Sequence, residues 1–119
     1  MRKYLSFRGI VGSGIGVEYL LPVSRMSKLE VENGGVGETV VKVRVEPDND
    51  QFIQLTFQPD FDTEKVAFNN FLNDNIKELC KTGNQNVVKK IGNHDNYIIY
   101  FKGSTGTIIE SVLTDVTRG

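Results

Sequence analysis

The residue types that most often carry chemistry are scarce in this chain. His94 is the only histidine and lies in a polar turn, and Cys80 is the only cysteine. A zinc or copper site needs several such ligands together, and a Ser-His-Asp arrangement needs a serine partner that the sequence does not identify. We therefore expect no metal ligand and no catalytic base at His94. Cys80 follows Leu79 near the end of a predicted helix, which predicts a buried small hydrophobe rather than a reactive thiol.

Four glycines between Gly9 and Gly16 raise the question of a phosphate-binding loop. A dinucleotide fingerprint would need glycine at position 17, where Val17 stands, and a P-loop would need lysine in place of Ile15. Both also need a helix to open directly after the glycines. The run Val17–Val23 is strand-like instead, and Pro22 bars a helix interior. We interpret the glycines as a hairpin tip.

Two groups of acidic residues suggest other sites. The segment Asp48–Asp50 spaces its oxygen atoms like a calcium loop, but the sixth loop position is Ile53 and the twelfth is Pro59, where glycine and glutamate are needed. A plain turn is the better interpretation. Asp60 and Asp62 precede the predicted helix and are interpreted as capping residues rather than as an acid–base pair. We predict no catalytic, cofactor-binding or metal-binding residue, and no enzyme.

Basic residues form two candidate groups near aromatic side chains. Cations beside exposed rings on a small β-domain can hold single-stranded nucleic acid. However, 14 basic residues against 15 acidic ones leave a formal charge of −1, which gives no electrostatic reason to expect a nucleic-acid partner. The first group is Arg2 and Lys3 with Arg8, and the second is Lys89 and Lys90 with Lys102, near Tyr97 and Tyr100.

Length and composition are those of one globular domain, residues 1–119. The hydrophobic fraction is 39% and the charged fraction 24%, which argues against disorder. A single cysteine forms no intramolecular disulfide and suits a reducing compartment. The N-terminal residues lack the apolar region of a signal peptide, and no apolar run approaches the roughly 18 residues that span a membrane. We expect a cytoplasmic location, or one inside a particle assembled there, and no membrane partner.

Period-2 alternation predicts short strands separated by Gly, Asn and Asp turns. Pro22 predicts a strand end, a bulge or an edge strand. The turn Asn33–Gly37 predicts a hairpin, and the three strands around it are expected to form an antiparallel meander. The predicted strands cover residues 2–10, 17–23, 28–32, 39–46, 52–57, 86–91, 97–102 and 107–116.

One helix is predicted over residues 63–81. Asp62 or Thr63 should cap it and Gly83 should end it. Its apolar residues recur on one face and should form the core, so that Phe71→Ala would cost about 3–5 kcal/mol. The fold class is therefore α+β: about six to eight mostly antiparallel strands in a curved sheet or small, partly open barrel, with this helix packed on it. The apolar stripe consists of Phe68, Phe71, Leu72, Ile76 and Leu79.

The strands carry more apolar surface than one helix can cover. Val40 and Val41 point to opposite faces, and Tyr97–Phe101 is apolar on both faces. Tyr97–Phe101 is either a central strand beneath the helix or a strand with one face against another chain. Surplus apolar surface favours association of copies of the chain, or docking to a larger assembly.

Two short stretches resemble a group of proteins. Met1–Leu5 and Leu20–Val23, with the strand, glycine loop, strand, meander and helix over residues 1–80, resemble small proteins of marine tailed phages, especially those that infect cyanobacteria. Such proteins are generally thought to be virion-associated and have no enzymatic residues to carry over. The charged strand Val41–Glu46 departs from the threonine-rich strands of that group. The meander and helix are also similar to pleckstrin-homology-like modules, without a ligand motif.

The resemblance and the absence of chemical motifs lead to one expectation of function. We expect a non-enzymatic phage structural or assembly protein that acts as a homo-oligomer through its apolar β surface, with other virion proteins as further partners. The resemblance implies a location in a virion or in the host cytoplasm. The alternative is a small β-domain that binds single-stranded nucleic acid or a small ligand.

Overall fold

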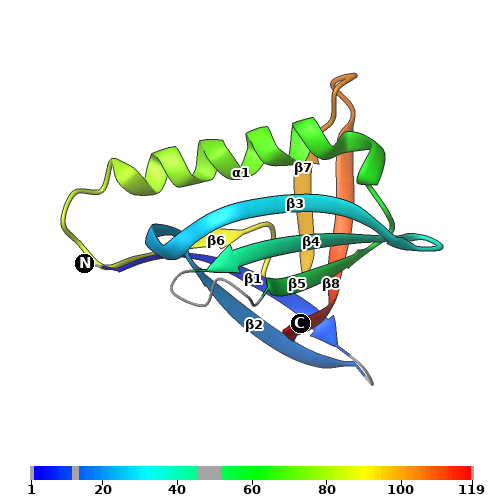
Figure 1. Ribbon diagram of the computed structural model, residues 1–119, viewed down its shortest axis with the longest axis horizontal. Coiled ribbons are helices and arrows are strands. Elements are labelled where there is room, and N and C mark those ends of the chain that lie inside the picture. The colour runs from blue at the N-terminus through cyan, green and yellow to red at the C-terminus, as the bar shows by residue number, and fades with distance from the viewer. Residues whose placement is uncertain (1, 12–13, 46–51, 119) are drawn as a thin grey trace.

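Over the residues that the structure describes, the fold is α+β, as predicted, with eight strands in one mostly antiparallel open sheet and one helix. The computed structural model describes residues 2–11, 14–45 and 52–118 (Figure 1). The first five strands are β1 Lys3–Val11, β2 Ile15–Pro22, β3 Met26–Gly35, β4 Glu38–Val45 and β5 Phe52–Gln58. The helix α1 Lys65–Cys80 follows, and β6 Val87–Ile91, β7 Ile98–Lys102 and β8 Ile108–Arg118 complete the chain. Short 3-10 turns, Val23–Arg25 and Asp62–Glu64, precede β3 and α1.

The strand order in the sheet is β2-β1-β8-β5-β4-β3. The predicted meander is confirmed, because β3, β4 and β5 pair antiparallel in chain order. β6 pairs parallel with the first half of β1, and β7 pairs antiparallel with the first half of β8. The pairing of β6 with β1 joins segments that are far apart in the sequence. Beside it, the backbone N–H of Arg2 donates a hydrogen bond to the side-chain oxygen of Asn86.

The sheet curves because β1 and β8 meet at a single point. Gly9 lies opposite Leu113, and this is the one pair in the register of the two strands over the described residues. A Cβ atom on Gly9 would lie 2.2 Å from the carbonyl oxygen of Leu113, so only glycine permits this approach. Beyond the crossing the two strands diverge, and β6 and β7 fill the space between them, linked by a bridge from Asn93 to Ile98.

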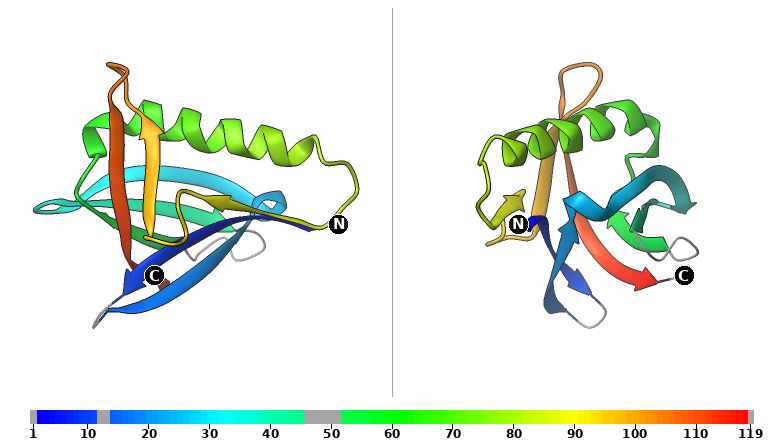
Figure 2. Two further views of the ribbon diagram at one scale, coloured as in Figure 1. Left: turned by 180° about the vertical axis from the view of Figure 1, so that it is seen from behind. Right: turned by 60° about the vertical axis from the view of Figure 1, so that its left-hand side comes forward.

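α1 lies along one side of the curved sheet, and β1 and β2 extend away from the helix (Figures 1 and 2). The predicted stripe faces the core: Phe68, Leu72 and Leu79 are buried, and Phe71 and Ile76 are half-buried. Inward-facing residues of the strands join them, among them Leu5, Phe7, Val31, Val41, Val43, Ile53, Leu55 and Phe57. β7 lies beneath the helix, with Ile99 and Phe101 buried, and β6 contributes Ile91.

The prediction that Asp62 or Thr63 caps the helix start was wrong. α1 begins after Glu64, and among the described residues no side-chain hydrogen bond caps it. The Glu64 carboxylate accepts hydrogen bonds from Ser104 instead, and the Asp62 carboxylate accepts one from Asn33 at 3.2 Å. These acids therefore tie the helix start to neighbouring turns. At the other end, Lys3 donates to the Leu79 carbonyl at 2.8 Å.

Two further predictions need correction or lie outside the described residues. Cys80 is exposed, not buried. It is the last residue of α1, one position beyond the buried Leu79, and the helical rotation turns it away from the sheet. The Asp48–Asp50 turn falls outside the described residues. No helix in the described ranges combines the length and the apolar character needed to cross a membrane.

Candidate binding face of β1, β2 and β6

The side of β1 that points away from α1 forms a continuous surface with its two neighbours. Leu5 and Phe7 are buried towards the core, so the alternate residues of β1 face the other way. The strand register places β2 residues on one side of these positions and β6 residues on the other. We call this surface the outer face; it consists of Arg2, Tyr4, Ser6 and Arg8, with Glu18, Leu20 and Pro22 from β2 and Val88 and Lys90 from β6.

One end of the outer face is closed by the turn between β6 and β7. His94 in this turn has a side chain that is only 9% exposed. Its Nε2 lies 3.1 Å from the carbonyl oxygen of Ser6, to which it must donate, and its Nδ1 lies 3.8 Å from a carboxylate oxygen of Glu18. Ser6 is buried beneath it.

This arrangement does not make a catalytic pair. The Ser6 hydroxyl has no hydrogen-bond partner in the described part of the chain, so His94 does not activate it as a nucleophile. The imidazole instead packs over β1 at Ser6. The sequence placed His94 in a turn, and only the fold reveals that the turn lies on the outer face.

Arg8 and Tyr97 hold the same turn in place. The Arg8 guanidinium donates to the His94 carbonyl at 3.0 Å, and its Cζ lies 5.0 Å from the centre of the Tyr97 ring. Tyr97 has a φ of 62°, a value uncommon for a residue other than glycine. Gly16 lies under the ring, since a Cβ there would be 2.8 Å from the Tyr97 hydroxyl. The close contact explains one glycine of the Gly9–Gly16 series.

The other end of the outer face is open to solvent. Arg2 and Lys90 are exposed, and the side chain of neither makes a hydrogen bond or ion pair with the described residues. Tyr4 lies between them, opposite Pro22 on β2 and Val88 on β6. Val88 is 51% exposed. Two cations therefore flank an aromatic and aliphatic surface.

A hollow of about 190 Å³ continues this open end towards the turn between β2 and β3. Its described lining contains three basic side chains and no carboxylate. The surroundings are therefore electropositive, although the whole chain carries a formal charge of −1. The lining residues are Arg2, Lys3, Tyr4, Pro22, Ser24 and Arg25.

The remaining cations of the two predicted basic groups point elsewhere. The Lys3 ammonium contacts Thr82 and the helix end, and Lys89 pairs with Glu78 of α1. Lys102 lies beside the N-terminal half of α1. The fold thus divides each predicted group, leaving Arg2 and Arg8 from one and Lys90 from the other on the outer face.

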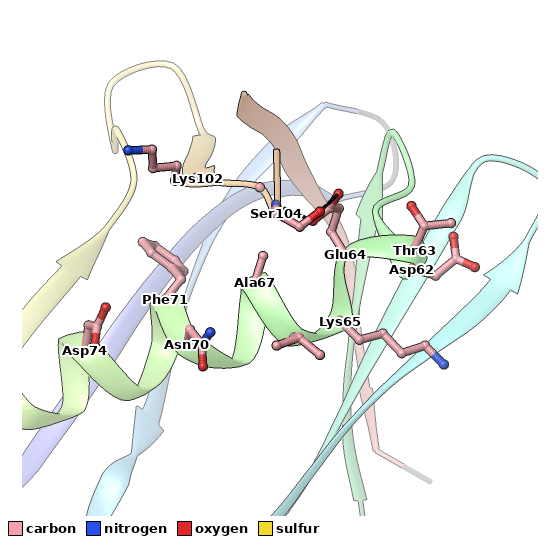
Figure 3. Close-up of a pocket in the computed structure, with 12 residues that line it drawn as sticks. Asp62, Thr63, Glu64, Lys65, Ala67, Asn70, Phe71, Asp74, Lys102 and Ser104 are labelled. Carbon is pink, nitrogen blue, oxygen red and sulfur yellow. Dashed lines mark hydrogen bonds between the residues drawn. The ribbon is translucent and has the colours of Figure 1, made fainter. Parts of the chain in front are cut away.

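A larger groove, of about 640 Å³, runs between α1 and the turn after β7. Figure 3 shows Phe71 and Ala67 on the helix side of this groove, with Lys102 and Ser104 across from them. The Glu64 carboxylate accepts from the backbone N–H of Ser104 at 2.8 Å and from its hydroxyl at 3.0 Å. The Glu64 carboxylate therefore joins the turn to the helix, and the rim of the groove carries both acidic and basic side chains.

Comparison with known proteins finds no matching family model, no matching curated protein and no matching solved structure. The assignment of a site therefore rests on the geometry of the chain itself. Within the described ranges, no three His, Cys, Asp or Glu side chains lie close enough together to hold a metal ion. Tyr100, which the sequence grouped with Tyr97, lies on β7 opposite Glu110 of β8. The outer face places Arg2 and Lys90 on either side of Tyr4.

Proposed function

We propose that this chain is a non-enzymatic structural or assembly protein of a phage particle and that it acts as a homo-oligomer. The phage setting is supported by the resemblance of residues 1–80 to small phage proteins. Self-association is supported by one structural observation, the regular and weakly protected edge of β2.

β2 and β3 lie at the two ends of the sheet, and in the described chain each pairs on one edge alone. Open edges can pair with another chain, and proteins guard against this with charges and bulges. β3 has both protections. Its outward side carries Lys28, Glu30 and Glu32, with a Lys28–Glu30 ion pair of 2.8 Å, and its register with β4 shifts near each end.

β2 has fewer such protections. Its register with β1 runs without interruption from Ile15 to Pro22. Glu18 is the one charged residue of the strand, and Leu20 beside it is 39% exposed. A regular edge of this kind presents the N–H and C=O groups of every second residue to an incoming strand.

A second copy of the same strand is the partner that fits this edge. Two β2 strands can pair antiparallel about a two-fold axis perpendicular to the sheet, so that the same residues meet on both sides. With Tyr19 opposite its own copy, Glu18 of one chain lies opposite Leu20 of the other. This register separates the two Glu18 carboxylates, whereas like charges placed directly opposite would destabilise the pair.

The test is the mass of the protein in solution. Light scattering over a concentration series to several hundred micromolar should show an oligomer for the unmodified chain. Leu20→Glu places a second carboxylate directly opposite Glu18 of the partner copy, so like charges face each other and the protein should shift to monomer. Val36→Glu is the matched control, because Val36 is fully exposed in the turn between β3 and β4. A monomer throughout the series, or equal effects of both substitutions, would refute the proposal.

A further inference from the structure

We infer that the outer face binds single-stranded nucleic acid, with phosphates at Arg2 and Lys90 and a base stacked on Tyr4. This function goes beyond self-association and does not depend on it, because it uses the face of the sheet rather than the edge of β2.

The charge distribution is the first support. The outer face carries Arg2, Arg8 and Lys90 against a single carboxylate, Glu18, which lies at the closed end beside His94. At the open end, the described lining of the hollow beside Arg2 includes Arg25 and no carboxylate, whereas the Lys3 ammonium turns to the end of α1. A row of cations on one face attracts the backbone phosphates of a nucleic acid, even though the chain as a whole carries no net positive charge.

The aromatic surface between the cations is the second support. Tyr4 is half-buried on a firm strand, and its neighbours across the sheet are Pro22 and the exposed Val88. A ring on such a platform offers a face to any base, whatever the sequence of the nucleic acid. Arg2 precedes Tyr4 by two positions and Lys90 lies opposite Ser6, so cations stand on both sides of the ring along the strand.

The dimensions favour a single strand over a duplex. From Arg2 to the row of Ser6 and Lys90 is four residues of β-strand, or about 13 Å, and the turn around His94 closes the face at Ser6 in that row. That length suits roughly two or three nucleotides. A duplex keeps its bases stacked inside and would leave Tyr4 without a base to contact.

The experiment measures binding of a fluorescein-labelled oligothymidine of about 15 nucleotides by fluorescence anisotropy, from low to moderate salt. Arg2→Ala with Lys90→Ala should weaken binding and reduce the salt slope by about 1.4, since each phosphate contact contributes ~0.7 in single strands. Tyr4→Leu keeps an apolar residue on the strand but removes the ring, and should weaken binding about fivefold or more at all salt concentrations. Thermal melts verify that each variant is folded.

Lys65→Ala with Lys77→Ala is the matched control, because it removes two exposed cations from α1 on the other side of the sheet. This variant should bind as the unmodified chain does. Absence of binding at low salt would overturn the inference. Equal losses from the two double substitutions would overturn it as well, and so would equal affinity for a duplex of the same length, which would indicate a nonspecific polyanion effect.

Discussion

The most demanding position for packing is Phe68. Its ring lies in a group of aromatic side chains, 4.9 Å from the ring centre of Phe61 and 5.4 Å from that of Phe101, and it is fully buried. Phe68→Ala should therefore cost about 3–5 kcal/mol through lost burial and the cavity left behind. The free energy of unfolding in urea measures this cost.

Phe71 provides the comparison on the same helix. It is half-buried and stacks on Phe101 at 5.7 Å, with its other side towards the groove of Figure 3. Phe71→Ala should cost less, roughly 1–3 kcal/mol, because water already reaches part of the ring. The value expected from the sequence for Phe71 thus belongs to Phe68. Equal costs for the two substitutions would contradict this assignment of the core.

Gly9 is a second residue on which the fold depends. A methyl group there would meet the backbone of Leu113, which cannot move without separating β1 from β8. Gly9→Ala should destabilise the protein by about 1–3 kcal/mol or more, as other overpacked positions do. Gly16→Ala is the control, because the atom it would meet is the end of the Tyr97 side chain. A smaller loss for Gly9→Ala than for Gly16→Ala in urea melts would contradict the crossing.

At the scale of elements, polar ties hold both ends of α1 to the sheet. Near the C-terminal end, Lys89 of β6 pairs with Glu78. The hydrogen bond from Lys89, and then its charge, lower the pKa of Glu78 below the ordinary value of 4.5. Since the folded pKa is the lower one, the tie stabilises the fold fully above about pH 4.5 and is lost as the pH falls through the folded value.

Glu78→Gln should consequently lower the urea midpoint slightly near neutral pH, and the difference from the unmodified chain should vanish as the pH falls well below 4.5. The effect is small because the side chains are exposed to solvent. High salt should reduce it further. A difference that persists at low pH would show that Glu78 acts through packing rather than charge.

The elements themselves were largely predictable from local patterns. Alternation located the strands within a few residues, and the stripe from Phe68 to Leu79 located the helix, because each depends on neighbouring residues alone. The caps were not predictable in this way. Asp62 and Glu64 have the chemistry of caps, but Asn33 and Ser104, which are distant in the sequence, compete for their carboxylates.

The outer face was only partly predictable. Its residues had been noted as basic groups, but strand alternation alone does not tell which strands will be neighbours. The parallel pairing of β6 with β1 brings Lys90 beside Ser6, and α1 withdraws Lys3 and Lys89 from the same groups. The net charge of −1 did not indicate the cations of the outer face, because a net charge does not describe how charges are distributed over the surface.

At the scale of the whole molecule, the two proposals reinforce each other. Pairing of two β2 strands about an axis perpendicular to the sheet leaves both outer faces on the same side. The open ends of the two faces would then present two sets of Arg2, Tyr4 and Lys90 to one strand of nucleic acid. Binding at the first face raises the effective concentration of the strand at the second.

This arrangement predicts a dependence on oligonucleotide length. The oligomer should prefer a strand long enough to reach both faces over a short one by at least about tenfold, whereas the Leu20→Glu monomer should show little preference. The added carboxylate weakens binding of both lengths alike, so the ratio of the two affinities isolates the contribution of the second face. Anisotropy titrations with oligothymidines of about 8 and 40 nucleotides measure the ratio. The same ratio for both proteins would show that the two faces do not bind one strand together. A longer oligonucleotide would then raise the affinity only by offering more binding positions to each separate face.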